Sequence, residues 1–436
     1  MRFVSKEKYN AEFPTVDELN NELTNKRFFG EIIREGQEIK YSGEMQIIYD
    51  DSDRVEISLP LAEAYEKQGL IINLPDNSRY YIEGKEIGCE RGDPITSNIH
   101  GSISVDFRPF DYTWCGANPP KNFPKGTVFQ ICFTNLLIND FWSAPRFRIG
   151  TLYFKFKQTK EDIWKTAMES KEGKITNVAI AKATGETTLE ELRDVLFSID
   201  ILFEIASSNR IRTPIVKFIL PNSEEGFMLF HQSSGIPAIN HFRMWHRLYT
   251  PELYVLSFFS KAAKLVHEKR NDWNLTHFAE SLIASNQGHI ERRLINIILA
   301  LETIHTGYVL DAALSNQKQI ESGINLQSKI FQSLNALNKS QVVNKKVFTE
   351  YFEISKLSEY RNMLFHQGKL PDYDNVLGAS DLSFKWLELA WFMFLNMCSF
   401  RCTFNKPPVN HELNYMLAEC ENCKIKKCNL KRKPKK

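Results

Sequence analysis

The feature that most constrains the fold is a change in the spacing of apolar residues near residue 226. Beyond this point they recur at helical intervals in four long segments joined by short polar connectors, namely 289–308, 317–337, 347–367 and 380–402. This arrangement is typical of an antiparallel helical bundle. The segment 380–402 is apolar around most of its circumference, so it is expected either at the centre of the bundle or in a dimer interface.

The N-terminal part of the chain has the sequence texture of a β-sheet region. Segments rich in β-branched and aromatic residues alternate with Gly, Asn, Asp and Pro at hairpin-like intervals. The predicted strands are 28–33, 39–50, 54–59, 99–107, 127–133 and 146–156, with 111–125 expected as a loop. A helix over 189–207 and a strand over 211–220 follow, the helix starting with a capping box of Thr188 and Glu191. The predicted fold class is therefore α+β.

These patterns divide the 436 residues into four parts. We expect a β-rich domain over 1–225, a helical connector over 226–284, a helical bundle over 285–410 and a basic, cysteine-containing tail over 411–436. Nothing near Met1 resembles a signal peptide, and the longest apolar stretch is too short to span a bilayer. These observations predict a cytoplasmic protein that does not bind a membrane.

The C-terminal tail is strongly basic. Residues 424–436 contain eight Lys or Arg and no acid, whereas the whole chain has a net charge of only +2, so the remainder is acidic. Such a tail predicts contact with the RNA backbone without sequence preference. The residues expected to bind RNA are Lys424, Lys426, Lys427, Lys431, Arg432 and Lys433. A solvated, disordered end is an equally supported interpretation.

The cysteines leave one metal site open. Cys420 and Cys423 have the spacing of a zinc-ligand pair, with Cys428 close behind and Cys402 or His411 as a candidate fourth ligand. A single pair without a matched second pair is weak evidence for zinc, so reduced cysteines without a metal are the first interpretation.

The segment 360–368, Tyr-Arg-Asn-Met-Leu-Phe-His-Gln-Gly, contains the candidate catalytic residues. Arg361 falls within the apolar stripe of its helix, where a cation is expected to face a carboxylate or a phosphate. Arg361 and His366 are five positions apart, about 140° around a helix, whereas Asn362 and His366 share a face. Gly368 suits a left-handed cap at the end of the helix.

This Arg-Asn-x-x-x-His pattern, at the end of a helix inside an all-helical half, resembles the Arg-x4–6-His motif of HEPN domains. It is most similar to the ApeA-like HEPN proteins, which have a β-rich region ahead of the helical bundle. Four residues separate Arg361 from His366 and a polar residue follows the arginine, and both details match the family pattern. The resemblance is specific for residues 285–405 and rests on the arrangement alone for the β-rich half.

The resemblance implies an endoribonuclease that acts in abortive-infection defence against phage and needs no metal or other cofactor. RNA cleavage without a metal requires a base, an acid and a cation near the phosphorus, which one Arg and one His cannot easily supply. HEPN domains typically dimerise, so that both copies of the motif form one composite site. By this resemblance Arg361 stabilises transition-state charge, His366 transfers protons, and Asn362 orients His366 or the phosphate.

The expected partners are RNA, with tRNA as one candidate, a second copy of the chain bound through the bundle, and a phage-derived trigger sensed by the β-rich domain. Two alternatives remain open. In one, Arg361 forms a salt bridge with an acid such as Glu302 and His366 donates to a carbonyl, so that the motif only fastens a helix end. In the other, the bundle is a non-catalytic module that dimerises and binds nucleic acid.

Overall fold

The computed structural model describes most of the chain between residues 122 and 398 and shorter pieces outside this range. The described residues are 13–15, 18–19, 27–33, 40–49, 55–60, 75–76, 78–79, 100–104, 112–115, 122–138, 144–160, 162–163, 165, 169, 175–230, 248–249, 252–321, 323–339, 345–371, 376–398 and 403–404. They belong to two compact units, within 1–242 and 262–268 and within 243–261 and 269–436. A β-sheet region precedes a helical C-terminal region, which confirms the α+β class.

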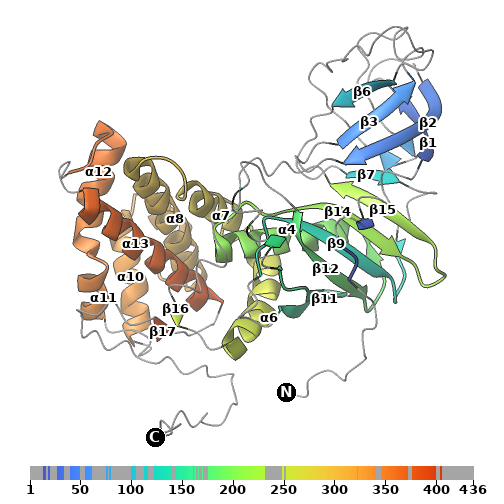
Figure 1. Cartoon of the computed structure of the whole chain (residues 1–436). Coiled ribbons are helices and arrows are strands. Elements are labelled where there is room, and N and C mark those ends of the chain that lie inside the picture. The colour runs from blue at the N-terminus through green and yellow to red at the C-terminus, as the bar shows by residue number, and fades with distance from the viewer. Residues whose placement is uncertain are drawn as a thin grey trace, which may run out of the picture. The chain divides into compact units, whose positions relative to one another are not determined.

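A seven-stranded antiparallel sheet is the main structure of the first unit, with the strand order β10-β11-β12-β9-β14-β15-β7 (Figure 1). Its strands are β7 (Tyr112–Cys115), β9 (Val128–Thr134), β10 (Arg146–Ile149), β11 (Leu152–Phe156), β12 (Ile175–Ala183), β14 (Arg212–Ile219) and β15 (Glu225–Phe230). Buried residues alternate with more exposed ones in β10, whereas nearly every residue of β12 is buried. The centre of the sheet is therefore covered on both faces, and the β10 edge on one.

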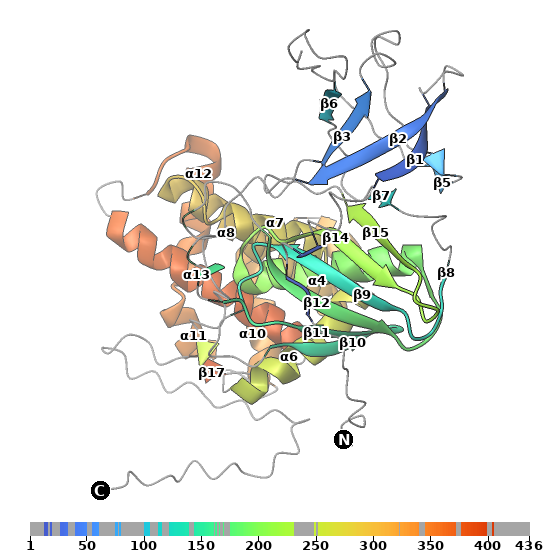
Figure 2. The same ribbon diagram turned by 45° about the vertical axis from the view of Figure 1, so that its right-hand side comes forward.

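Helix α4 (Leu189–Ser207) packs against this sheet (Figure 2). The predicted capping box is present: Thr188 Oγ1 accepts from the Glu191 N–H at 3.1 Å, and Glu191 Oε2 accepts from the Thr188 N–H at 2.8 Å. On the sheet side, the Phe203 ring contacts those of Phe147 and Phe156, with centroids 6.4 and 5.0 Å apart. The capping box therefore starts α4, and aromatic packing holds it on the sheet.

The remaining strands form smaller sheets. One has the order β1-β2-β3-β6, with β1 (Arg27–Ile33), β2 (Lys40–Tyr49), β3 (Val55–Pro60) and β6 (His100–Ser104). Three two-stranded sheets pair β4 (Pro75–Asp76) with β5 (Ser78–Arg79), β8 (Asn122–Phe123) with β13 (Thr187–Thr188), and β16 (Leu248–Tyr249) with β17 (Thr403–Phe404).

Most predicted strands are confirmed, with three corrections. The single strand predicted over 146–156 is the hairpin β10–β11, because Gly150 turns the chain with a φ of +53°. Part of the expected loop 111–125 is β7, which pairs through its backbone with β15. The turn after β14 leads directly into β15 of the same sheet, which was not predicted and extends beyond residue 225.

The second unit is a helical bundle. Helix α6 (Glu252–Lys269) contains residues of both units, and the bundle continues with α7 (Leu275–Ala284), α8 (Ile290–Asp311), α9 (Gln317–Glu321), α10 (Leu326–Lys339), α11 (Lys345–Tyr351), the 3-10 turn η1 (Ile354–Lys356), α12 (Leu357–Gln367) and α13 (Val376–Met397). Helix α8 contacts α7, α10, α12 and α13. Trp386 and Trp391 of α13 are fully buried, as the apolar circumference of this segment predicted.

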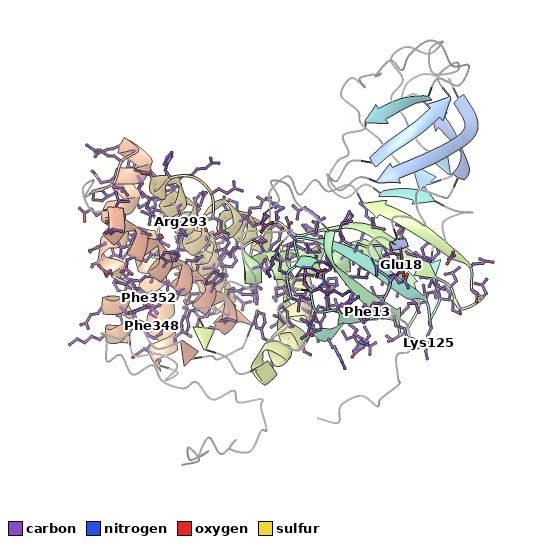
Figure 3. The ribbon with its side chains drawn as sticks, in the orientation of Figure 1. Phe13, Glu18, Lys125, Arg293, Phe348 and Phe352 are labelled. Carbon is purple, nitrogen blue, oxygen red and sulfur yellow. The ribbon has the colours of Figure 1, made fainter. Side chains whose placement is uncertain are left out.

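Two of the four predicted long helices are interrupted, and α7 lies within the segment 226–284 that was expected as a helical connector. The segment 317–337 is divided into α9 and α10 near Gly323, whose φ is +99°. The segment 347–367 is divided into α11, η1 and α12 at Glu353, which has a φ of +47°. Here Trp386 Nε1 donates to the Phe352 carbonyl at 2.8 Å, so tertiary contacts take up a backbone group that a continuous helix would use. Phe352 itself packs on Phe348 of α11 with ring centroids 5.4 Å apart (Figure 3).

Among the described residues, only α8 has the length and apolar composition of a membrane-spanning helix. Half of its apolar stretch is buried by the protein, as in the core helix of a bundle, so the composition of α8 is weak evidence for a membrane.

Candidate functional site

Helix α12 contains all three predicted catalytic residues. It runs without interruption from Leu357 to Gln367, so Arg361 and His366 keep the predicted angular separation of about 140°. Arg361 is partly buried, whereas Asn362 and His366 are exposed. Gly368 ends the helix in the left-handed conformation with a φ of +66°, as predicted. The motif is therefore at the surface end of a well-defined helix.

The buried face of α12 fixes the position of the motif. Leu357, Tyr360 and Leu364 are buried, and the Tyr360 ring meets the Trp386 indole edge-on with centroids 5.5 Å apart. Edge-to-face contacts of this kind stabilise aromatic pairs by about 0.5–1.5 kcal/mol beyond their buried area. Packing on α13 therefore orients α12, which leaves its other side free to present the motif.

Arg361 faces an acid, as its place in the apolar stripe predicted. Its Nη2 lies 3.8 Å from Oε2 of Glu302 on α8, which is within ion-pair range but too long for a hydrogen bond. The guanidinium also lies over the Phe365 ring, 5.6 Å from its centroid. Its Nε is buried and has no hydrogen-bond partner among the described residues. The guanidinium is thus held loosely, and its buried Nε donates to none of the described residues.

Glu302 is shared with a second cation. Lys329 Nζ on α10 lies 3.5 Å from Glu302 Oε1 and donates to Thr306 Oγ1 at 2.9 Å. The Lys329 side chain is only 6 % exposed. Because Arg361 and Lys329 have one carboxylate between them, this group of three side chains has a net positive charge. No sequence pattern indicates the part played by Lys329, which follows from how α8, α10 and α12 pack.

A buried histidine lies beside this group but is not a candidate base. His305 Nδ1 is 3.1 Å from Ser333 Oγ, whose hydrogen is donated to the Lys329 carbonyl at 2.9 Å, so Nδ1 is the donor. Burial, together with the positive charge of Lys329, lowers the pKa of His305 to about 3. His305 is therefore neutral near pH 7 and contributes packing and a hydrogen bond.

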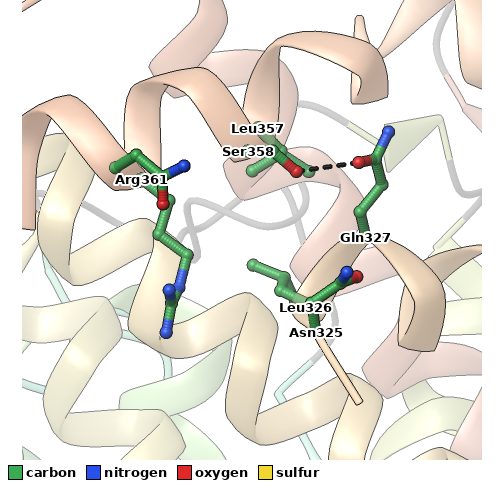
Figure 4. A pocket seen from close by; sticks show the side chains of 7 residues that line it. Asn325, Leu326, Gln327, Leu357, Ser358 and Arg361 are labelled. Carbon is green, nitrogen blue, oxygen red and sulfur yellow. Dashed lines mark hydrogen bonds between the residues drawn. The ribbon is translucent and has the colours of Figure 1, made fainter. Parts of the chain in front are cut away.

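A pocket of about 260 Å³ opens beside Arg361, between the first turn of α10 and α12 (Figure 4). Its lining residues are Asn325, Leu326, Gln327, Leu357, Ser358, Arg361 and Asn362. Ser358 Oγ donates to Gln327 Oε1 at 2.7 Å across the pocket (Figure 4). The structure thus brings Arg361 and Asn362 together in one pocket but does not include His366 in its lining.

One of the two contacts required by the alternative in which the motif only fastens a helix end is observed. The Arg361–Glu302 ion pair that it requires is formed, although it is long. Among the described residues, however, none accepts a hydrogen bond from His366, which is exposed in the last turn of α12. His366 is therefore not fixed to a carbonyl of the described bundle.

The other predicted site residues lie outside the described part of the chain. These are the tail residues Lys424, Lys426, Lys427, Lys431, Arg432 and Lys433, and the candidate zinc ligands Cys402, His411, Cys420, Cys423 and Cys428. Within the described residues, no three His, Cys, Asp or Glu side chains are grouped as a metal site, and Cys132 and Cys398 are buried free thiols. Burial raises the pKa of both thiols, so neither is a reactive nucleophile.

No family model, no curated protein and no solved structure matches this chain. The resemblance to HEPN domains therefore rests on the motif in α12 and on the order of the sheet and helical regions.

Proposed function

We propose that this protein is an endoribonuclease of the HEPN type, in which Arg361, Asn362 and His366 form one half of a composite site. The observation that supports this most directly is the state of Arg361. Its guanidinium is held by one long ion pair, and its Nε has no partner among the described residues. A phosphate accepts well from a guanidinium, so a phosphodiester in the place of the Glu302 carboxylate would pair with this loosely held cation.

The residues of the motif match the needs of RNA cleavage by the neighbouring 2′-hydroxyl. The 2′-oxygen attacks the phosphorus and loses its proton to a base, while an acid protonates the leaving 5′-oxygen. Products are a 2′,3′-cyclic phosphate and a 5′-hydroxyl. One exposed His366 per chain can be the base or the acid, and Arg361 can stabilise the charge on the phosphorane. A second copy of the chain, related by a two-fold axis, would supply the second histidine.

In this function the β-rich unit is a regulator that senses a phage-derived trigger. The helical unit offers α8, α10, α12 and α13 as the HEPN bundle, with the motif at the end of α12. In this account the protein acts in the cytoplasm as a homodimer and cleaves RNA during abortive infection. The basic tail would add RNA affinity that decreases with salt.

The test is incubation of the purified full-length protein with total cellular RNA in EDTA, beside His366→Ala and Arg361→Ala. We expect cleavage that survives chelation, leaves 5′-hydroxyl ends and is lost in both variants. His277→Ala is a matched control because His277 is exposed on α7, outside the motif. Equal cleavage by His366→Ala and wild type would exclude the catalytic role. RNA binding without cleavage in all variants, even after addition of a phage lysate, would instead indicate the non-catalytic binding module.

A further inference from the structure

The pocket between the first turn of α10 and α12 offers hydrogen-bond donors to a ligand. Gln327 Oε1 already accepts from Ser358, and Asn325 Oδ1 already accepts from the Ser328 N–H at 2.8 Å. The NH2 groups of these two amides donate to none of the described residues, so both are available to an acceptor on a ligand. Asn362 and Arg361 complete the polar lining, and no carboxylate is among the lining residues. This set of groups matches an acceptor-rich, negatively charged ligand.

The positive charge beside the pocket also favours a negatively charged ligand. Arg361 and Lys329 share the single carboxylate of Glu302, and Arg361 Nε is buried without a partner among the described residues. The ion pair with Glu302 is 3.8 Å long and includes no hydrogen bond, so a ligand with a better-placed acceptor can replace the carboxylate beside Arg361. A phosphate oxygen within reach of the Arg361 Nη atoms is such an acceptor.

The size of the pocket limits what it can hold. Its volume of about 260 Å³ is just below that of pockets for drug-sized molecules. One phosphoryl group with its attached sugar fits this volume, whereas a dinucleotide cofactor does not. The apolar side chains of Leu326 and Leu357 supply the part of the wall that a sugar face contacts.

We propose that this pocket binds the phosphoryl group and sugar of one nucleotide, with Gln327 as a binding contact next to Arg361 and Ser358 as a positioning residue that acts through Gln327. The inference deepens the proposed function, since in an RNA substrate this nucleotide adjoins the one that is cleaved. Gln327 donates its NH2 to the phosphate or sugar, and the Ser358 hydroxyl holds the amide in this orientation. Neither residue belongs to the motif, and they are 31 positions apart in the chain.

The test is equilibrium binding of a short fluorescent 2′-O-methyl oligoribonucleotide to the full-length protein in EDTA. The 2′-O-methyl group prevents cleavage, so binding is measured separately from catalysis. A short probe at physiological salt also limits the contribution of the basic tail. Unlabelled probe, AMP and inorganic phosphate serve as competitors. AMP that displaces the probe as well as unlabelled oligonucleotide does would identify a free nucleotide as the ligand. Displacement by the oligonucleotide alone would identify an internal phosphodiester.

The variants are Gln327→Ala and Ser358→Ala, with Ser355→Ala as the control because Ser355 is exposed on η1 and does not line the pocket. We expect affinity to fall about tenfold in Gln327→Ala, the effect of losing one hydrogen bond to a charged group. Gln327→Glu keeps the acceptor for Ser358 and the shape of the side chain, so it also tests the pocket if an alanine variant fails to fold. Its negative charge is expected to weaken binding further.

The outcome separates this inference from the proposed function. Probe binding that is lost in the Gln327 variants, in a protein that cleaves no RNA, would support the pocket and oppose the nuclease. Cleavage that depends on His366, together with unchanged probe binding in Gln327→Glu and Ser358→Ala, would overturn the pocket and leave the nuclease. Inorganic phosphate that competes as well as AMP and the oligonucleotide would overturn the sugar contact.

Discussion

Arg361 and Glu302 face each other across the contact between α12 and α8, with 3.8 Å between Nη2 and Oε2. Their side chains are 40 % and 33 % exposed, and no hydrogen bond joins them. Ion pairs of this kind contribute about 0.2–1 kcal/mol. The pair is therefore strong enough to orient Arg361 and weak enough for a phosphate to replace the carboxylate. In the proposed function, Glu302 is the counterion that RNA would displace from Arg361.

Replacing Glu302 with Gln is expected to increase RNA affinity. The substitution removes the charge that competes with phosphate for Arg361, and the exposed pair energy corresponds to about a 1.5- to 5-fold gain in affinity. The measurement is binding of an uncleavable RNA at several salt concentrations. Glu359→Gln is the matched control. Glu359 is exposed on α12, the helix of Arg361, and forms no ion pair with Arg361 in the described structure. Equal gains in both variants would show only a general charge effect, and a loss of affinity in Glu302→Gln would mean that Glu302 must hold Arg361 in place.

The hydrogen bond from Trp386 Nε1 to the Phe352 carbonyl is expected to hold the break that precedes α12. Trp386→Phe keeps the ring contact with Tyr360 but leaves the carbonyl of Phe352 buried and without this donor. We expect a local destabilisation of about 1–3 kcal/mol, seen as faster hydrogen exchange of the amides of α12.

Trp273→Phe is the control for this substitution. Trp273 is also buried, but its Nε1 has no hydrogen-bond partner among the described residues, so the exchange of a Trp for a Phe removes no bond. We expect little change in α12 for this variant. If the amides of α12 exchange hydrogen at the same rate in Trp386→Phe and in wild type, ring packing alone sets the start of the helix.

The elements that were predicted correctly are those determined by local sequence. Helix α4 follows from its apolar spacing and the capping box of Thr188 and Glu191, whose two hydrogen bonds are present. The central position of α13 follows from an apolar circumference that only a buried helix can satisfy. The motif residues were found because all three lie within one helical turn and a half, where spacing alone fixes their relative direction.

The elements that were missed depend on contacts between distant parts of the chain. Glu353 interrupts a helical pattern because Trp386 and Lys385 of α13 bind the backbone and side chain at the break, the Lys385 Nζ to Glu353 Oε1 distance being 2.7 Å. Gln327 and Ser358 form the pocket only because α10 and α12 pack together. The spacing of apolar residues cannot predict such a pair, since neither Gln327 nor Ser358 is unusual for a helix.

The free energy of unfolding of the helical unit is expected to decrease as the pH falls below 6.5, the ordinary pKa of a histidine. The pKa of His305 is lowered from 6.5 to about 3, so between these values the unfolded chain binds a proton that the folded chain does not. The free energy of unfolding then falls by up to about 1.4 kcal/mol per pH unit. Urea unfolding followed by far-ultraviolet circular dichroism measures this slope.

His305→Leu should show a smaller slope over the same range and, near neutral pH, a loss of about 1 kcal/mol from the missing bond to Ser333. Ser333→Ala is expected to keep the slope, because burial is the larger cause of the low pKa. A slope that vanishes in Ser333→Ala would mean that the hydrogen bond, and not burial, keeps His305 neutral.

The buried side chain of Asp200 is expected to give the β-rich unit the opposite pH dependence, with a stability that decreases as the pH rises. Thr213 Oγ1 donates to Asp200 Oδ1 at 2.8 Å, but Oδ2 is buried without a partner among the described residues. Burial raises the pKa of Asp200 well above 3.8, and the charge of Arg212 opposes this only in part. Between the unfolded and folded values the folded chain binds more protons, so the stability from this group is fully present at low pH and is lost as the pH rises through the folded pKa.

Asp200→Asn keeps the shape and removes the ionisation, so it should be more stable than wild type at about pH 8. The free energy of unfolding should rise by about 1.4 kcal/mol for each unit by which folding raises the pKa of Asp200. This difference from wild type should shrink as the pH is lowered. Hydrogen exchange of α4 and β14 measures this. Glu204→Gln, one turn further along α4, should instead destabilise the unit, because Glu204 Oε1 accepts from Arg212 Nη1 at 2.6 Å and the substitution removes the negative charge that balances this arginine. If Asp200→Asn is also destabilising at both high and low pH, Asp200 is ionised in the folded protein and Arg212 serves both carboxylates.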